Sequence, residues 1–313
     1  MRAAAVVAFA VVAVGALSCL SPGCASPPPP PPVAAPLPTP TPVPTRAVPP
    51  KLGIALGGGG ARGFSEVGVL RVLEQEKIPV SFVAGTSVGS LVGAMYADTG
   101  RVLDAEFHAV AATDEDLFDY AALSILSGGF VKGEKLETFL VKRLKHRNIE
   151  DFAIPYAAVA TNLRTGKTVL FDRGSAARAV HASAAIPGVF VPVEIAGETY
   201  VDGGVTNPIP VDVVRARGCD VVIAVAIPAA VPRTTPRTPI EVAFHAVTVM
   251  SAEIGRLRAR EADVVITPDV GDVAYDDFTQ KKRLIEAGEA AARQALPAIR
   301  AAIAAKTRMV PVR

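Results

Sequence analysis

The chain has 313 residues, of which 50% are hydrophobic and 20% are charged, and its formal net charge is +2. This length accommodates one α/β domain with additional segments. A nearly neutral charge excludes nucleic acid as the main partner, because phosphate binding requires a basic surface. Cys219 is the single cysteine after residue 50, which excludes a disulfide framework and a cysteine-based metal site there. No cofactor or metal is expected.

The first residues have the layout of an export signal. Residues 1–25 contain one arginine, a continuous apolar run, and then small residues with Cys19 and Cys24. Each cysteine follows a small residue and is a candidate for the lipid-modified cysteine of a lipoprotein, although "ALSC" and "SPGC" both depart from the ideal motif. The apolar run is short for a membrane-spanning helix, which needs about 20 residues, so an uncleaved anchor is the alternative. We expect export in a bacterium, to the periplasm or to a membrane as a lipoprotein.

Proline dominates the next segment. Residues 26–50 begin with "SPPPPPP", and such runs favour extended polyproline II because proline fixes φ and lacks an amide donor. This segment is predicted to be a disordered tether. The folded domain is expected over residues 51–305, and residues 306–313 are expected to be a C-terminal tail.

From residue 51, strand-like and helix-like patterns alternate. The expected strands are residues 51–56, 80–85, 156–163, 167–172, 190–195, 198–203, 219–227 and 262–268. The expected helices are residues 65–77, 90–100, 133–147, 175–184, 208–217, 240–261 and 277–305. Strand–helix alternation with tight glycine turns predicts parallel pairing, whereas "LRTGK" and "IAGE" are typical of hairpin turns. The prediction is an α/β fold of three layers, with a mixed, mostly parallel sheet and helices on both faces.

A glycine-rich loop follows the first of these strands, in "LGIALGGGGARGFSEVGVL" at residues 52–70. It is not a P-loop, because the Gly-Lys-Ser/Thr ending is absent. The loop fits GxGxxG from Gly58 to Gly63, but a dinucleotide site also requires an acidic residue at the end of the second strand, and "VSFVAG" has none. These absences disfavour a nucleotide as the ligand of the loop.

The second strand ends in "GTSVG" at residues 85–89, which is the G-x-S-x-G pattern between a strand and a helix. A turn this sharp requires small residues at Gly85 and Gly89, because side chains there would collide with the strand or the helix. It exposes the Ser87 hydroxyl at the N-terminus of the next helix, where the helix dipole favours developing negative charge. The alternative is an ordinary N-cap serine in a glycine-rich turn.

The two loops follow neighbouring parallel strands and are expected to open at the same edge of the sheet. The backbone amides of Gly58, Gly59 and Gly60 should then face the space above Ser87. Glycine allows such donors to approach a reacting carbonyl oxygen, and each donor lowers an acyl-transfer barrier by about 3 to 4 kcal/mol. The glycine loop is therefore predicted to be an oxyanion hole.

A serine nucleophile needs a base. Asp202, in "ETYVDGGVTNPIP", ends a hairpin strand, although by itself the pattern is also typical of a turn aspartate that binds its own backbone. His245, on an amphipathic helix, follows Ser87 and Asp202 in the order of a triad, so a Ser–Asp–His triad is the alternative to a Ser87–Asp202 dyad. None of the other histidines is expected on the short loop where a triad histidine belongs. His108 is expected in a further helix around "DAEFHAVA", His146 in the helix at residues 133–147, and His181 at a helix end.

The motifs "GGGGARG", "GTSVG" and "DGG" resemble, in order and spacing, those of bacterial patatin-like phospholipases. "ATNLRTGKTVLF" and "ASAAIPGVFVPVEI" extend the resemblance over about residues 52–227. It implies a Ser–Asp dyad without histidine, with Ser87 as nucleophile, Asp202 as base, the glycine loop as oxyanion hole and Arg62 as the basic residue of that loop. One departure is "GFSEVG", in which Glu66 stands where a histidine is frequent.

The resemblance also implies a lipid or fatty-acyl ester as substrate and a membrane surface as partner. Two other functions remain open at this point. One is an exported module that binds lipid or nucleotide without catalysis. The other is an acyltransferase, in which an alcohol instead of water accepts the acyl group from the acyl-enzyme.

Residues 113–133 are either a lid over the site or connecting structure.

Overall fold

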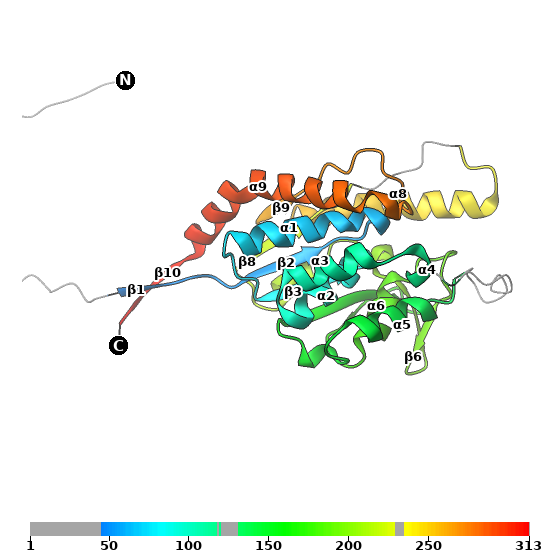
Figure 1. Cartoon of the computed structure of the whole chain (residues 1–313), viewed down its shortest axis with the longest axis horizontal. Coiled ribbons are helices and arrows are strands. Elements are labelled where there is room, and N and C mark those ends of the chain that lie inside the picture. The colour runs from blue at the N-terminus through cyan, green and yellow to red at the C-terminus, as the bar shows by residue number, and fades with distance from the viewer. Residues whose placement is uncertain (1–44, 118, 120–130, 229–234, 313) are drawn as a thin grey trace, which may run out of the picture. The chain divides into compact units, whose positions relative to one another are not determined.

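The computed structural model describes residues 45–117, 119, 131–228 and 235–312 (Figure 1). The predicted export signal, most of the predicted tether and much of the predicted lid segment lie outside the described residues. Within the described ranges, none of the helices combines the length and the apolarity that crossing a bilayer requires.

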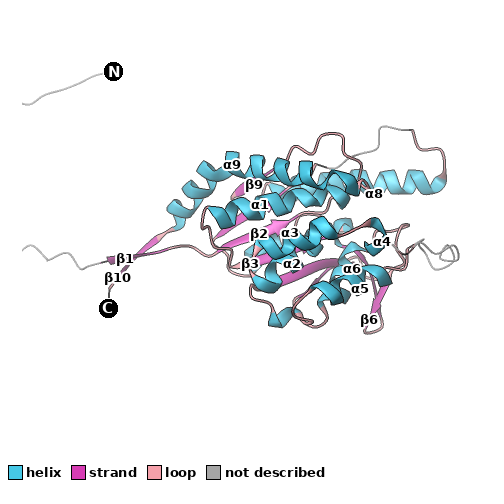
Figure 2. Cartoon of the chain, in the orientation of Figure 1, coloured by secondary structure: helices cyan, strands magenta, loops and turns pink. Residues whose placement is uncertain are grey.

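The helices and strands follow the predicted alternation (Figure 2). The strands are β1 (Thr45–Val48), β2 (Leu52–Leu56), β3 (Phe82–Thr86), β4 (Tyr156–Asn162), β5 (Thr168–Phe171), β6 (Val193–Ile195), β7 (Glu198–Asp202), β8 (Val221–Val225), β9 (Val264–Ile266) and β10 (Arg308–Pro311). The α-helices are α1 (Phe64–Gln75), α2 (Val88–Thr99), α3 (Val102–Ala111), α4 (Asp114–Leu117), α5 (Glu134–Arg143), α6 (Ala176–Ala184), α7 (Val211–Ala216), α8 (Pro239–Ala259) and α9 (Lys281–Lys306).

The main sheet has the strand order β6-β7-β4-β3-β2-β8-β9, and β5 also pairs with β4. The central pairs are parallel, namely β2 with β3 and β8, β3 with β4, and β8 with β9. The β4–β5 and β6–β7 pairs are antiparallel, as the two hairpin turns predict. The β6–β7 turn places Ala196 and Gly197 at φ 51° and 78°, which matches the two left-handed residues of a type I′ turn.

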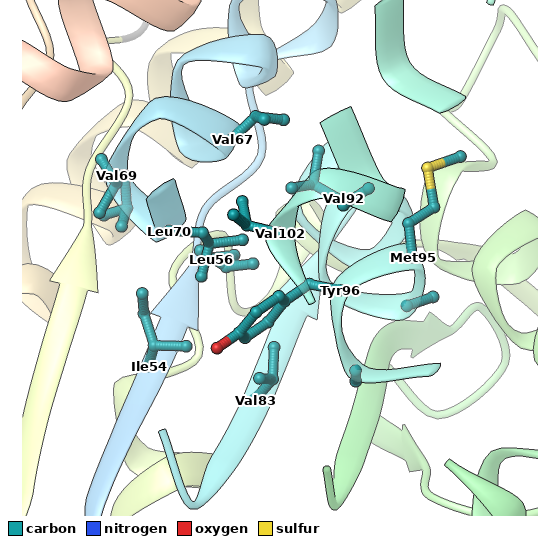
Figure 3. Packing of buried hydrophobic residues seen from close by; sticks show 14 of the residues in the cluster. Ile54, Leu56, Val67, Val69, Leu70, Val83, Val92, Met95, Tyr96 and Val102 are labelled. Carbon is teal, nitrogen blue, oxygen red and sulfur yellow. The ribbon is translucent and has the colours of Figure 1, made fainter. Parts of the chain in front are cut away.

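Helices cover both faces of the sheet because the central strands are buried on both sides. Ile54 and Leu56 of β2 belong to the cluster that includes α1, α2 and α9, and Figure 3 shows part of this packing. Ala55, between them, belongs to the cluster of the opposite face, which includes α7 and the end of α8. A Cβ on Gly53 would lie 2.3 Å from Cγ1 of Val214 in α7, so the close approach of this helix requires glycine. The predicted three-layer α/β fold is confirmed.

Two local expectations differ from the structure. Helix α5 ends at Arg143, so the prediction that His146 lies in a helix is wrong. The Asp98 carboxylate instead accepts the backbone N–H of His146 and lies 2.8 Å from its Nδ1, and this contact stabilises a non-helical chain. Strand β1 falls in the predicted tether and β10 in the predicted tail, yet they pair antiparallel in a two-stranded sheet (Figure 1). Strand pairing between remote segments leaves no local sequence signal.

Candidate active site

Ser87 occupies a strained turn between β3 and α2. Its φ of 56° and ψ of −126° lie in a region that residues other than glycine rarely adopt. A Cβ on Gly85 would lie 2.2 Å from the carbonyl oxygen of Gly89, and a Cβ on Gly89 would lie 2.5 Å from that of Leu56. Both glycines therefore allow the backbone contacts that force Ser87 into this conformation.

Side-chain hydrogen bonds hold the backbone of the turn. The Ser87 amide donates to Oγ of Ser183 at 3.0 Å, and the Ser183 hydroxyl donates to the carbonyl of Val159 in β4 at 2.6 Å. The Ser90 hydroxyl donates to the Ser87 carbonyl at 2.6 Å. Because both backbone groups of Ser87 are bound in this way, the orientation of its side chain is set from three elements, α2, α6 and β4.

Asp202 is the last residue of β7, and its side chain is buried beside Ser87. Pairing of β7 with β4 places Asp202 opposite Ala160, one strand away from the end of β3. Its Oδ1 accepts the Gly204 amide at 2.7 Å, which is the turn-aspartate bond that the Asp-Gly pattern indicates. The carboxylate also interacts with the Ser87 side chain. The same aspartate therefore caps its turn and faces the predicted nucleophile.

Burial changes the basicity of Asp202. It raises the pKa of the carboxyl from 3.8 to about 6, and the nearby Ser87 side chain and the hydrogen bond from Gly204 oppose this rise only in part. At neutral pH the carboxylate is mainly ionised, and it accepts a proton more readily than an exposed aspartate, whose pKa is about 4. The pKa thus lies close to the pH at which a general base works best.

The glycine loop differs from the prediction at one of its three expected donors. The Gly58 amide donates to the carbonyl of Pro208 at 3.0 Å, so it is already used in the fold and is not an oxyanion donor in this conformation. Among the described residues, the amides of Gly59 and Gly60 donate to no protein acceptor. Gly60 has φ +58°, and a Cβ there would lie 2.3 Å from the carbonyl oxygen of Tyr275, so this position needs glycine on two grounds.

The buried Arg62 side chain stabilises the conformation of the glycine loop. Only 3% of the residue is exposed, and its Nε donates to the carbonyl of Gly59 at 3.1 Å. Its Nη1 donates to the carbonyl of Pro228 at 2.8 Å. No carboxylate forms an ion pair with Arg62 in the part of the chain that the structure describes. The guanidinium therefore fixes the conformation in which Gly59 presents its amide.

Two cavities share Ser87 in their linings. The first has a volume of about 310 Å³ and includes Asp202, Gly58, Gly59 and Arg62. The second, of about 350 Å³, has a mainly apolar lining: Val88, Leu91, Leu117, Leu136, Val189 and Phe190. Because Ile186, Phe244 and Tyr275 also line both, the two cavities are adjacent and meet at this serine.

No histidine lines either cavity in the described ranges. His245 lies on α8, where its neighbours Phe244, Val247 and Thr248 contribute to the first cavity, but the His245 side chain does not. His181 is buried elsewhere, with Nδ1 2.6 Å from Oε1 of Glu137. The geometry thus favours the dyad over the triad that uses His245.

Tyr275 and Ser183 contact Ser87, and sequence reasoning missed both. Tyr275 lies in the irregular segment between β9 and α9, lines both cavities, and interacts through its side chain with Ser87. Its surroundings, "GDVAYDDF", contain no motif, so no local signal could have found it. Ser183 lies inside α6, where a small polar residue has no distinctive pattern.

Glu66 is completely buried at the start of α1. Among the described residues, neither carboxyl oxygen has a hydrogen-bond partner, and the neighbouring Gly57 amide donates to the carbonyl of Val225 instead. Burial raises the pKa of Glu66 well above its usual 4.5. Burial therefore favours the neutral form of Glu66, the residue that departs from the family pattern. Glu66 lines neither of the two cavities at Ser87.

The fold and the site together define a class of protein: an α/β protein with a serine on a strand–turn–helix elbow, an aspartate from another strand beside it, and a neighbouring glycine loop. The chain belongs to the patatin-like phospholipase family, whose family model matches residues 54–215. This membership confirms the resemblance carried by the three glycine motifs.

The alignments with individual relatives cover only part of the length of each relative. An uncharacterized NTE family protein of Mycobacterium tuberculosis is 36% identical over 178 residues, which cover 57% of this chain and 49% of that protein. Lysophospholipase NTE1 of Saccharomyces cerevisiae is 34% identical over 181 residues, which cover 56% of this chain and 10% of the yeast protein. The crystal structure of VipD from Legionella pneumophila aligns over 83% of this chain and 68% of VipD, with 15% identity and a TM-score of 0.48. The chain thus spans about half the length of the mycobacterial relative and a tenth of the yeast one.

Proposed function

We propose that this protein hydrolyses acyl esters of lipids, with Ser87 as the nucleophile and Asp202 as the base. One observation carries the proposal. The Ser87 side chain, held on a strained turn, interacts with a buried carboxylate whose pKa is raised to about 6. A hydroxyl paired with a base of matched pKa, at the wall of an apolar cavity, is suited to nucleophilic attack on an ester.

In this mechanism Asp202 accepts the Ser87 proton as Oγ attacks the ester carbonyl. The tetrahedral intermediate collapses, the protonated Asp202 gives its proton to the leaving alcohol, and an acyl ester forms on Ser87. A water molecule then attacks this ester while Asp202 takes one of its protons. Collapse of the second intermediate returns that proton to Oγ and releases the fatty acid.

The amides of Gly59 and Gly60 are the donors that we propose for the oxyanion. Each is without a protein acceptor among the described residues, and Arg62 holds the carbonyl of Gly59. Loss of one such donor typically lowers kcat by about 10²- to 10³-fold.

The substrate class follows from the second cavity. Its apolar lining suits a fatty acyl chain, whose burial is favourable by about 0.8 kcal/mol per methylene. The name of the yeast relative, a lysophospholipase, supports a lipid ester as substrate for this chain too. We therefore propose phospholipids, lysophospholipids or related acyl glycerols as the substrates.

Hydrolysis of a p-nitrophenyl acyl ester tests this proposal. Ser87→Ala and Asp202→Asn are each expected to abolish activity. Ser81→Ala, an exposed serine before β3, and Asp272→Asn, whose side chain is 97% exposed, are the matched controls and should retain it. A fluorophosphonate should label wild type at Ser87. Labelling at another residue, or full activity of Ser87→Ala, would refute the assignment.

The alternatives predict different results. Loss of activity in His245→Ala with the fold intact would support the triad. If wild type hydrolyses no lipid ester in a bacterial lipid extract, the protein is a binding module. If acyl chains pass to added glycerol or lysolipid in preference to water, as product mass spectrometry would show, it is an acyltransferase.

We also propose, from the sequence of residues 1–25, that the protein is exported and acts at a membrane surface. Fractionation of the host cell should place it in the envelope, and the mass of the mature N-terminus identifies any lipidated cysteine. Cys19→Ser and Cys24→Ser are the variants that distinguish the two candidates. Recovery of unprocessed protein from the cytoplasm would contradict the proposal.

A further inference from the structure

Tyr275 packs closely against the glycine loop. Its carbonyl accepts the Ala61 amide at 2.7 Å, and its ring lies 5.5 Å from the guanidinium carbon of Arg62. A Cβ on Gly60 would lie 2.7 Å from two atoms of the ring, so the loop has no room for a side chain there. These contacts leave the phenol little freedom to turn away from the site.

Tyr275 lines both cavities together with Ser87, and Asp202 lines the first of them, so the phenol lies near the serine hydroxyl and in the field of the carboxylate. Burial and the negative charge of Asp202 both raise the pKa of Tyr275, so the phenol stays protonated throughout the neutral range. A hydroxyl that keeps its proton can donate a hydrogen bond at every stage of the reaction.

The roles of Ser87, Asp202 and Tyr275 follow from which hydrogen bonds each side chain can donate or accept. An ionised carboxylate only accepts, so the proton on Ser87 Oγ is directed to Asp202. Oγ then has lone pairs free, and Tyr275 is the donor beside them.

We propose that Tyr275 is a further catalytic residue, which donates a hydrogen bond to Oγ of Ser87; the inference rests on the proposed function. Its largest effect falls on deacylation. In that step the bond between the acyl carbon and Oγ breaks, Oγ takes the electron pair, and Asp202 supplies the proton. Tyr275 keeps its own proton and stabilises the negative charge that develops on Oγ. During acylation the same bond mainly orients the hydroxyl, because Oγ starts as a neutral hydroxyl and its electron pair enters the new bond as its proton passes to Asp202.

Tyr275→Phe tests this role, because phenylalanine keeps the ring contacts with Arg62 and the glycine loop. Tyr96→Phe, at a buried tyrosine of α2 that lines neither cavity, is the matched control. The assay is the pre-steady-state release of p-nitrophenol from an acyl ester, together with the mass of the intact protein during turnover. Hydrogen bonds to charged groups contribute about 1.5 to 3 kcal/mol, so steady-state kcat should fall roughly 10- to 100-fold.

The distinctive result is accumulation of the acyl-enzyme. In Tyr275→Phe the burst of p-nitrophenol should persist, and a mass increase of one acyl group on Ser87 should last longer than in wild type. Tyr96→Phe should match wild type in both respects. An equal fall in the burst rate and in kcat, without acyl-enzyme, would assign Tyr275 a structural role and overturn the inference. Wild-type kinetics in Tyr275→Phe would also overturn the inference.

The two proposals fail in different ways. If Ser87→Ala retains hydrolysis, the proposed function is wrong and the inference falls with it. If Ser87→Ala and Asp202→Asn are inactive while Tyr275→Phe behaves as wild type, the dyad stands and only the role of Tyr275 is refuted.

Discussion

Replacing Asp202 with asparagine is expected to abolish the activity and to stabilise the fold at neutral pH. Burial raises the pKa of this carboxyl from 3.8 to about 6. Between these values the folded protein holds a proton that the unfolded chain has released, so stability falls as the pH rises. The contribution of the group is fully present below pH 3.8 and lost above about pH 6.

The size of the expected stability difference follows from the shift in the pKa of Asp202. About two pKa units at 1.36 kcal/mol each give about 3 kcal/mol of destabilisation by the ionised carboxylate at pH 8. Asparagine carries no charge at any of these pH values, and its side-chain oxygen can still accept the Gly204 amide. The Asp202→Asn protein should therefore unfold with a free energy higher than that of wild type by up to about 3 kcal/mol at pH 8, and by about half as much at pH 5.

Urea unfolding of both proteins at pH 5 and pH 8 measures this difference. Asp272→Asn serves as the control, since that side chain is 97% exposed, and its stability difference from wild type should not change with pH. If Asp202→Asn is less stable than wild type at pH 8, or if its advantage is the same at both pH values, burial does not raise the pKa of this group and the argument for its basicity fails.

Three further predictions concern the same region. The kcat/KM of wild type should fall about tenfold per pH unit below about pH 6, because protonated Asp202 cannot accept the serine proton, and a profile flat to pH 5 would contradict this. Gly89→Ala should lose activity and lower Tm, because its Cβ would lie 2.5 Å from a backbone oxygen, whereas Gly255→Ala meets no atom closer than 3.4 Å and should change Tm little. Glu66→Gln should match wild type near pH 4 and become increasingly more stable as the pH rises, because burial raises the pKa of Glu66, and thermal unfolding across that range would show it.

Much of the fold could be predicted from local sequence patterns. The buried central strands are short apolar runs, and the turns between them contain glycine where the backbone requires it. The elbow is predictable for the same reason, since Gly85 and Gly89 are both needed to let neighbouring backbone approach Ser87. Patterns of this kind act over a few residues and therefore remain visible in a single sequence.

The partners of Ser87 depend on contacts between segments that are remote in sequence. Only the packing of β7 beside β4 shows that Asp202, and not His245, faces the serine, and only burial raises the pKa of that carboxyl. The fold likewise commits the Gly58 amide to Pro208 and brings Tyr275 to the site without any motif. Hydrogen-bond partners and desolvation are properties of the assembled interior, so tertiary structure alone decided them.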